Sequence, residues 1–179
     1  MRETVHAAFA ATAARTPGAA FLFTESVTAR AYGIPAGSVA WAEAAARVSD
    51  LRSAYEAAGY GHGHRVGLLL DNRPDFLFHW FALNALGVSV VPIHSEMRSA
   101  ELAYLIGHSE IGLAICLAPR RADLQAAAAQ AGIAFETADA QLTGGVPPAR
   151  GPATHGGGDP IGPGTECALL YTSGTTGRP

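Results

Sequence analysis

Six consecutive residues near the end of the chain have the side chains and the backbone freedom needed to hold phosphate groups. They are Thr172, Ser173, Gly174, Thr175, Thr176 and Gly177, and they follow the apolar run 167–171. Glycine adopts positive φ angles and lets the backbone approach an anion closely. Successive backbone N–H groups in such a turn form a concave nest for phosphate oxygens. The hydroxyls add donors, and each hydrogen bond to a charged oxygen contributes about 1.5–3 kcal/mol.

This loop differs from the commoner phosphate-binding motif G-x-x-x-x-G-K-[ST], because Gly174 and Gly177 are too closely spaced. On composition alone, the same residues also suit a surface turn rich in serine, threonine and glycine. The residues by themselves therefore leave both interpretations open.

The cysteines and histidines, which could react or bind a metal, are expected to have structural roles. Cys116 and Cys167 each lie in a short apolar run, which predicts reduced, buried thiols. His62 and His64 lie in a glycine-flanked turn without further ligands at a recognisable spacing, so we interpret them as loop residues. The sequence thus predicts no metal site.

The loop needs a sheet to root it, and the preceding sequence predicts one. Apolar patterns predict helices at about 4–15, 41–58, 74–86, 99–107 and 121–131, and strands at 20–24, 65–70, 88–93, 111–117, 133–137 and 167–171. This alternation is typical of βαβ units. We therefore expect an α/β fold with a mainly parallel sheet flanked by helices, in which strands 66–70, 88–93 and 111–117 are neighbours.

Local signals predict the starts of three helices and the inner face of one. Thr4, Asn72 and Ser99 are the expected N-caps, because their side chains accept hydrogen bonds from the first helical N–H groups. The inner side of the helix at 74–86 is expected to carry Phe76, Leu77, Trp80, Phe81 and Asn84.

The composition changes between residues 144 and 165, where thirteen of the 22 residues are glycine or proline. Such a stretch is typical of an exposed linker or loop. We therefore divide the chain into an α/β part at 1–143, a linker or loop at 144–165, and a last strand with the candidate phosphate loop at 166–179.

The composition also excludes several classes. With 49% hydrophobic and 15% charged residues, the chain is not generally disordered. The formal net charge is −3 and the basic residues are scattered, which argues against a nucleic-acid partner. The apolar stretch 76–93 is interrupted by His79, Asn84, Gly87 and Pro92, so it predicts a helix and a strand and no transmembrane segment.

The final nine residues, YTSGTTGRP, resemble the signature loop of the adenylate-forming (AMP-binding) superfamily. That superfamily includes acyl-CoA synthetases, luciferase-type enzymes and the adenylation domains of peptide synthetases. The resemblance covers nearly the whole chain, and its upstream parts are 14–17, 59–66, 72–76, 86–93 and 100–104. His64 stands where the family usually has aspartate, and Ala40 where a capping threonine or serine is common.

The resemblance implies a mechanism and a set of ligands. In this family a carboxylate attacks the α-phosphate of Mg²⁺-bound ATP to form an acyl-adenylate. In most members a thiol, usually coenzyme A, then displaces AMP. Residues Thr172, Ser173, Gly174, Thr175, Thr176 and Gly177 would clasp the ATP phosphates as hydrogen-bond donors. The family's nucleotide-pocket motifs and catalytic lysine do not occur in these residues. We therefore expect an inactive N-terminal fragment of a cytoplasmic acyl-CoA ligase of fatty acid or related metabolism, without a catalytic residue of its own.

Residues 72–80 and 91–94 resemble most the crotonobetaine/carnitine-CoA ligase group. Two alternatives remain open. One is the adenylation domain of a peptide synthetase, and the other is a short binding module without catalysis.

Overall fold

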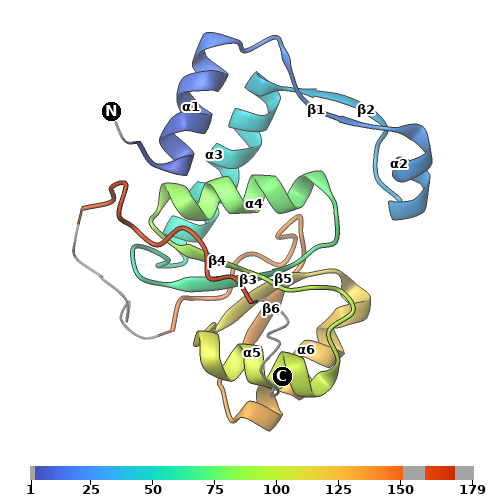
Figure 1. The fold of residues 1–179 in the computed structure, drawn as a ribbon, viewed down its shortest axis with the longest axis vertical. Helices are drawn as coiled ribbons and strands as arrows, with labels where there is room; N and C mark the ends of the chain where they lie inside the picture. Colours follow the sequence, from blue (N-terminus) through green and yellow to red (C-terminus); the bar gives the residue numbers. More distant parts are fainter. Residues whose placement is uncertain (1–2, 151–159, 172–179) are drawn as a thin grey trace.

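A parallel sheet between two layers of helices forms the centre of the molecule (Figure 1). The computed structural model describes residues 3–150 and 160–171. Strands β3 (Arg65–Leu69), β4 (Ser89–Pro92), β5 (Leu113–Cys116) and β6 (Glu136–Ala138) pair in the order β4-β3-β5-β6, all in parallel. The predicted α/β class and the neighbourhood of the three central strands are therefore confirmed.

Each face of the sheet is covered by its own helices. Helices α1 (Val5–Arg15), α3 (Trp41–Ala57) and α4 (Pro74–Ala85) lie on one side, and α5 (Ser99–Ser109) and α6 (Arg121–Ala131) on the other (Figure 1). Residues of β3 alternate between the two cores: Val66 and Leu68 pack into the first, and Leu69 into the second. Burial on both faces explains why these strands are continuous apolar runs in the sequence.

A separate two-stranded sheet precedes the main sheet in the sequence. Strands β1 (Ala20–Thr24) and β2 (Gly37–Ala40) pair antiparallel, and α2 (Ser26–Tyr32) lies between them. The sequence did not predict α2, because this helix buries only Ala29 and so leaves no apolar periodicity to detect.

One of the three predicted caps is confirmed. The Thr4 hydroxyl accepts a hydrogen bond from the Ala7 N–H at 3.1 Å. The other two predictions are wrong by one residue: the N-cap of α4 is Arg73 and not Asn72, and the N-cap of α5 is Arg98 and not Ser99. At α5, the Glu101 carboxylate accepts a hydrogen bond from the Arg98 N–H at 2.8 Å. An acidic side chain in the first turn thus provides a hydrogen-bond partner for the backbone N–H of the N-cap residue.

The predicted inner face of α4 is confirmed in part, because Phe76, Trp80 and Phe81 pack partly buried against the first core and Asn84 is buried. The buried residues are Phe78, His79, Ala82, Leu83 and Asn84, whereas Leu77 is 38% exposed. Helix α4 lies between the sheet and helices α1 and α3, and it is apolar on nearly every side. A helix of this kind offers no single stripe from which its orientation can be predicted.

The expected last strand is reduced to one bridge. Ala168 pairs in parallel with Val90, so residues 166–171, which we call the root segment, lie beside the edge strand β4. Cys167 is exposed and not buried as predicted, whereas Cys116 is buried. The difference arises because, within the described part of the chain, the root segment has a sheet neighbour on one side only.

The glycine- and proline-rich segment is described only at its two ends. Val146 and Ala149 pack against the first core, and the Ala149 N–H donates to the Ala58 carbonyl at 2.8 Å. At the other end, the Gly162 N–H donates to the Thr165 hydroxyl at 3.0 Å. The boundaries at 143/144 and 165/166 stay predictions.

Gly87 allows a test of how tightly the chain packs around residues 62 and 161. Its φ is +71°, and a Cβ there would lie 3.0 Å from Ile161 Cγ1 and 3.1 Å from His62 Cβ. Gly132 has a similar φ of +70° with open space around it. We expect Gly87→Ala to lower the free energy of unfolding by about 2–4 kcal/mol, because backbone strain and overpacking add. Gly132→Ala, which adds strain alone, is expected to cost about 1–2 kcal/mol.

Urea unfolding of the two variants, followed by circular dichroism, measures this difference. Equal losses for Gly87→Ala and Gly132→Ala would show that residues 62 and 161 yield freely to an added methyl group.

Candidate functional site

A cleft opens at the carboxyl ends of β3 and β4. Its volume is about 530 Å³, and its walls include Leu70, Asn72, Pro92, His94, Met97 and Tyr171. We call it the carboxyl-end cleft. Ligands of open α/β sheets bind outside the carboxyl ends of the strands, so this is the expected place for a substrate. The size also lies within the range of small-molecule sites.

Two arginines brace the walls of the carboxyl-end cleft. Arg73 donates to the Tyr32 carbonyl, and its guanidinium lies 5.8 Å from the centroid of the Tyr32 ring. Arg120 donates to the carbonyls of Ser95 and Met97 and forms an ion pair with Asp123. The end of α2 and the turn after β4 are thus held by side chains from other elements.

The predicted phosphate-binding residues, Thr172, Ser173, Gly174, Thr175, Thr176 and Gly177, lie outside the described residues, so their role stays a prediction. Their position along the chain is nevertheless informative. Tyr171, the residue joined to Thr172, lines the carboxyl-end cleft. The last described residue before the predicted loop therefore lies at the rim of this cleft.

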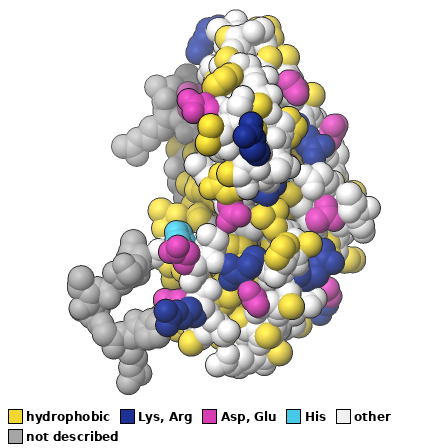
Figure 2. Space-filling view, turned by 90° about the vertical axis from the view of Figure 1, so that its right-hand side faces the viewer, with side chains coloured by type: hydrophobic (Ala, Val, Ile, Leu, Met, Phe, Trp, Pro, Cys, Tyr) yellow, Lys and Arg dark blue, Asp and Glu magenta, His cyan; other side chains and the backbone are white. Residues whose placement is uncertain are grey.

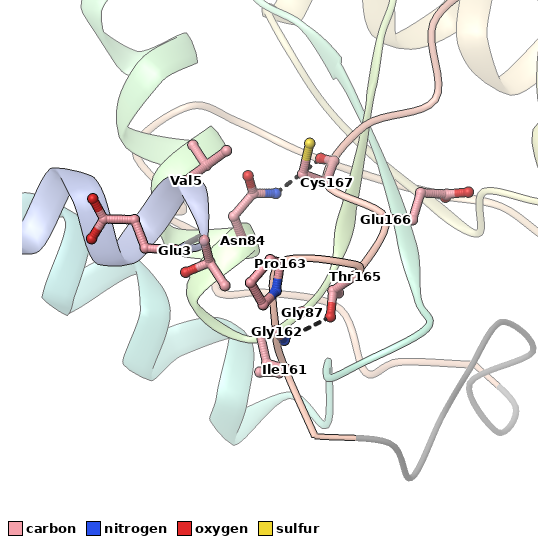
Figure 3. A pocket seen from close by; sticks show the side chains of 11 residues that line it. Glu3, Val5, Asn84, Gly87, Ile161, Gly162, Pro163, Thr165, Glu166 and Cys167 are labelled. Carbon is pink, nitrogen blue, oxygen red and sulfur yellow. Dashed lines mark hydrogen bonds between the residues drawn. The ribbon is translucent and has the colours of Figure 1, made fainter. Parts of the chain in front are cut away.

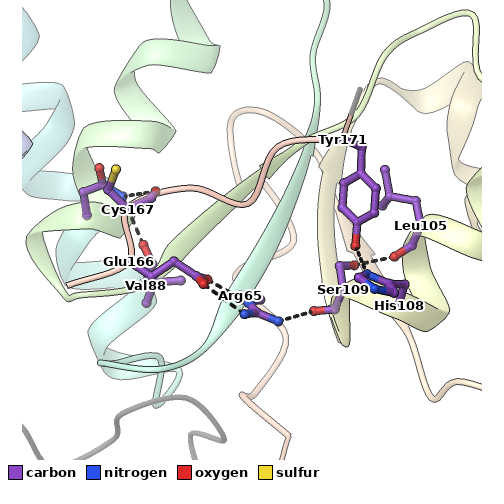
Figure 4. Close-up of polar contacts among 9 residues, drawn as sticks. Arg65, Val88, Leu105, His108, Ser109, Glu166, Cys167 and Tyr171 are labelled. Carbon is purple, nitrogen blue, oxygen red and sulfur yellow. Dashed lines mark hydrogen bonds and ion pairs between the residues drawn. The ribbon is translucent and has the colours of Figure 1, made fainter. Parts of the chain in front are cut away.

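The root segment that leads to this point is held at its start by hydrogen bonds from β3, β4 and α4 (Figure 4). At its start, Arg65 Nε and Nη2 donate to the two Glu166 carboxylate oxygens at 2.8 and 3.0 Å. This hydrogen bonding raises the pKa of Arg65. The Cys167 carbonyl accepts from the Val90 N–H at 3.1 Å and from Asn84 Nδ2 at 3.0 Å.

A second, smaller pocket lies at the opposite end of the strands (Figure 3). It measures about 80 Å³ and lies between the start of α1 and residues 161–167, with Asn84 and Gly87 in its wall. It is too small for a nucleotide. Within the described part of the chain, the buried Asn84 Oδ1 has no hydrogen-bond partner, whereas Asn84 Nδ2 also donates to the Val88 carbonyl at 3.1 Å. We interpret this pocket as a packing feature.

His79 is a buried polar residue that sequence reasoning noted only as an interruption. Its Nδ1 lies 2.8 Å from Tyr55 Oη and its Nε2 lies 2.9 Å from the Ala140 carbonyl. A carbonyl only accepts, so Nε2 carries the proton and Nδ1 accepts from the tyrosine. Burial lowers the pKa of His79 to about 4, against smaller opposing effects of the Ala140 hydrogen bond and of Asp75. No sequence signal links the three partners.

The surface and the described residues add three findings. Acidic and basic side chains are interspersed on the face shown in Figure 2. Over residues 3–150 and 160–171, no cluster of three or more histidine, cysteine or acidic residues has the geometry to hold a metal ion. In the same ranges, no helix combines the length and the apolarity needed to cross a membrane.

A parallel sheet between helical layers, with a cleft at its carboxyl edge, is the architecture of many nucleotide-dependent α/β enzymes. The family model described as "AMP-binding enzyme" matches residues 9–179. The chain therefore belongs to the AMP-binding enzyme family, as the resemblance of the loop indicated.

Curated relatives of the chain are CoA ligases. Sulfoacetate–CoA ligase of Cupriavidus necator is 33% identical over 132 residues, which are 72% of this chain and 26% of that protein. Crotonobetaine/carnitine–CoA ligase of Salmonella paratyphi A is 36% identical over 61 residues, which are 34% of this chain and 12% of that protein. The chain thus spans about a quarter or less of these relatives.

Solved structures show the same fold. A long-chain-fatty-acid–CoA ligase from Archaeoglobus fulgidus matches with a TM-score of 0.77 at 17% identity, over 98% of this chain and 35% of that chain. O-succinylbenzoate coenzyme A synthetase from Bacillus subtilis, in complex with AMP, matches with a TM-score of 0.69 at 20% identity, over 94% of this chain and 39% of that chain. The fold is therefore that of the N-terminal domain of adenylate-forming enzymes.

Proposed function

We propose that this chain is the N-terminal part of an ATP-dependent acyl-CoA ligase. The whole enzyme would activate a carboxylic acid as an acyl-adenylate and transfer the acyl group to coenzyme A in the cytoplasm. The observation that carries the proposal is the position of Tyr171, which brings the start of the family's signature loop to the rim of the carboxyl-end cleft. The CoA-ligase relatives support the choice of thiol acceptor.

In the first step of this reaction, a carboxylate oxygen forms a bond to the α-phosphorus of ATP, and pyrophosphate leaves with the electrons of the broken P–O bond. Catalysis of such a step depends on alignment and on donors aimed at the phosphate oxygens. In the proposal, Thr172, Ser173, Thr175 and Thr176 supply hydroxyl donors, and the glycines let backbone N–H groups approach. In the second step, the coenzyme A thiolate attacks the acyl carbon and AMP leaves.

Mg²⁺ is expected to accompany ATP. The described residues contain no cluster suited to the ion, so we assign no Mg²⁺ ligand and no step through the metal to this part of the chain.

The test is carboxylate-dependent ATP–pyrophosphate exchange, measured on the full-length enzyme that contains these residues. Carnitine, crotonobetaine, sulfoacetate and a series of fatty acids form a suitable first panel, because these acids or classes are named in the relatives. We expect exchange with at least one carboxylate, followed by an acyl-CoA thioester when coenzyme A is added. Exchange with amino acids and no thioester would favour a peptide-synthetase adenylation domain, and no exchange with any acid would contradict the proposal.

A further inference from the structure

Three aromatic rings meet where the root segment ends. His108, near the end of α5, stacks on Tyr104 with ring centroids 5.5 Å apart and planes inclined by 21°. Tyr171 meets the His108 ring edge-on, at 5.6 Å and 86°. Its hydroxyl oxygen lies 2.7 Å from His108 Nδ1, which is a short hydrogen bond (Figure 4). The cluster thus joins the last described residue to a helix on the second face of the sheet.

This contact complements the anchors at the other end of the root segment. Glu166 is held by Arg65, and the Cys167 carbonyl is held by Val90 and Asn84. Between these anchors and Tyr171, the side chain of Leu170 is 65% exposed and provides little packing. The Leu169 N–H also donates to the Val90 carbonyl at 2.9 Å, and the side chains of Leu169 and Tyr171 pack against the second core. The hydrogen bond to His108 adds a side-chain contact at the residue directly before the predicted loop.

The ring contacts alone would fix that end less well. Edge-on and stacked aromatic contacts are favourable over a range of ring separations. A hydrogen bond, in contrast, loses strength steeply when its length or angle changes. Because Thr172 follows Tyr171 directly, any displacement of the Tyr171 backbone moves the start of the loop.

We propose that His108 is a positioning residue for the phosphate-binding loop and acts through its hydrogen bond to Tyr171. The inference rests on the proposed function, since it assumes that residues 172–177 hold the ATP phosphates. It adds a residue from α5, 64 positions before the loop, that touches neither substrate nor reacting atoms. Loss of the hydrogen bond is expected to raise the KM for ATP more than the KM for the carboxylate.

The test compares two substitutions that each remove one hydroxyl from the same ring cluster. In the full-length enzyme, Tyr171→Phe is expected to raise the KM for ATP about fivefold, the effect of losing one ordinary hydrogen bond, and to leave the KM for the carboxylate unchanged. Tyr104→Phe is the matched control, because it leaves the contact between His108 and Tyr171 in place, and we expect it to change neither constant.

Variants of the histidine separate positioning from general stability. His108→Leu is expected to match Tyr171→Phe, and the double variant is expected to be no worse than either single one, because both remove the same contact. His108→Asn keeps a polar atom near the position of Nδ1 and is expected to restore most of the ATP affinity. A purely structural role would lower the melting temperature without this selective rise in the KM for ATP.

The outcomes separate the two proposals. If the unsubstituted enzyme exchanges pyrophosphate but Tyr171→Phe behaves like Tyr104→Phe, the inference about His108 is overturned and the proposed function stands. If the unsubstituted enzyme shows no exchange with any carboxylate, the proposed function fails and the inference falls with it.

Discussion

The 179-residue chain by itself is expected to show no carboxylate-dependent ATP–pyrophosphate exchange above background. ATP is a polyanion, and its reacting phosphate needs counter-charges that follow the developing charge. All twelve basic residues of the chain are arginines. The two that brace the carboxyl-end cleft are already engaged, Arg73 with the Tyr32 carbonyl and Arg120 with Asp123. The described walls thus offer a shaped cleft without a mobile cation.

Incorporation of labelled pyrophosphate into ATP measures this prediction, with the full-length enzyme as the positive control. Cooperative urea unfolding of the same preparation must first show that the chain is folded. Exchange by the isolated chain would mean that these residues contain a complete adenylation site. Tight ATP binding without exchange would favour the alternative of a binding module.

Acidification from pH 7 to pH 5 is expected to lower the free energy of unfolding by about 2 kcal/mol through His79 alone. Burial lowers the pKa of His79 to about 4 in the folded state, whereas an unfolded histidine has a pKa of about 6.5. Between these values the unfolded chain binds a proton that the folded chain does not, so stability falls as the pH falls. Well above pH 6.5 both states are neutral and this effect is absent.

His79→Gln removes the titration and is expected to flatten the pH dependence of stability between pH 5 and pH 7. The variant also loses the bond from Tyr55, so its stability at pH 7 is expected to fall by about 1–3 kcal/mol. His6→Gln is the matched control: burial also lowers the pKa of His6, but that ring is only partly buried. If His79→Gln keeps the slope of the parent, the acid sensitivity arises elsewhere. Asp139, whose pKa is lowered by hydrogen bonds, contributes only at lower pH.

The central sheet was predictable because its physical signal is local. Strands β3 and β5 are buried on both faces, so their sequences are short apolar runs between turn residues, and parallel pairing follows from the helices between them. The root segment has a similar apolar sequence and gave a wrong prediction of a buried strand. The sequence of residues 167–171 does not indicate whether the segment pairs with a strand on one side or on both sides.

Features that depend on tertiary partners were not predictable. The hydrogen bonds of His79 join residues 24 and 61 positions away, and neither Tyr55 nor Ala140 carries a signal for them. The inner face of α4 was predicted only in part for a related reason, since a helix packed on several sides is apolar on several sides. The family of the loop was recognised by resemblance, whereas its composition alone left a surface turn as an open alternative.

The ion pair between Arg65 and Glu166 also bears on the order in which the molecule assembles. Its partners are 101 residues apart, whereas Arg65 and its strand partner Ser89 are separated by 24. That fourfold difference corresponds to two doublings of loop length, or about 1.2 kcal/mol of additional closure entropy. A chain that emerges from the ribosome N-terminus first presents β3, β4 and β5 long before Glu166. The root segment is therefore expected to dock after β3, β4 and β5 have paired, so that the candidate site forms later than the sheet that supports it.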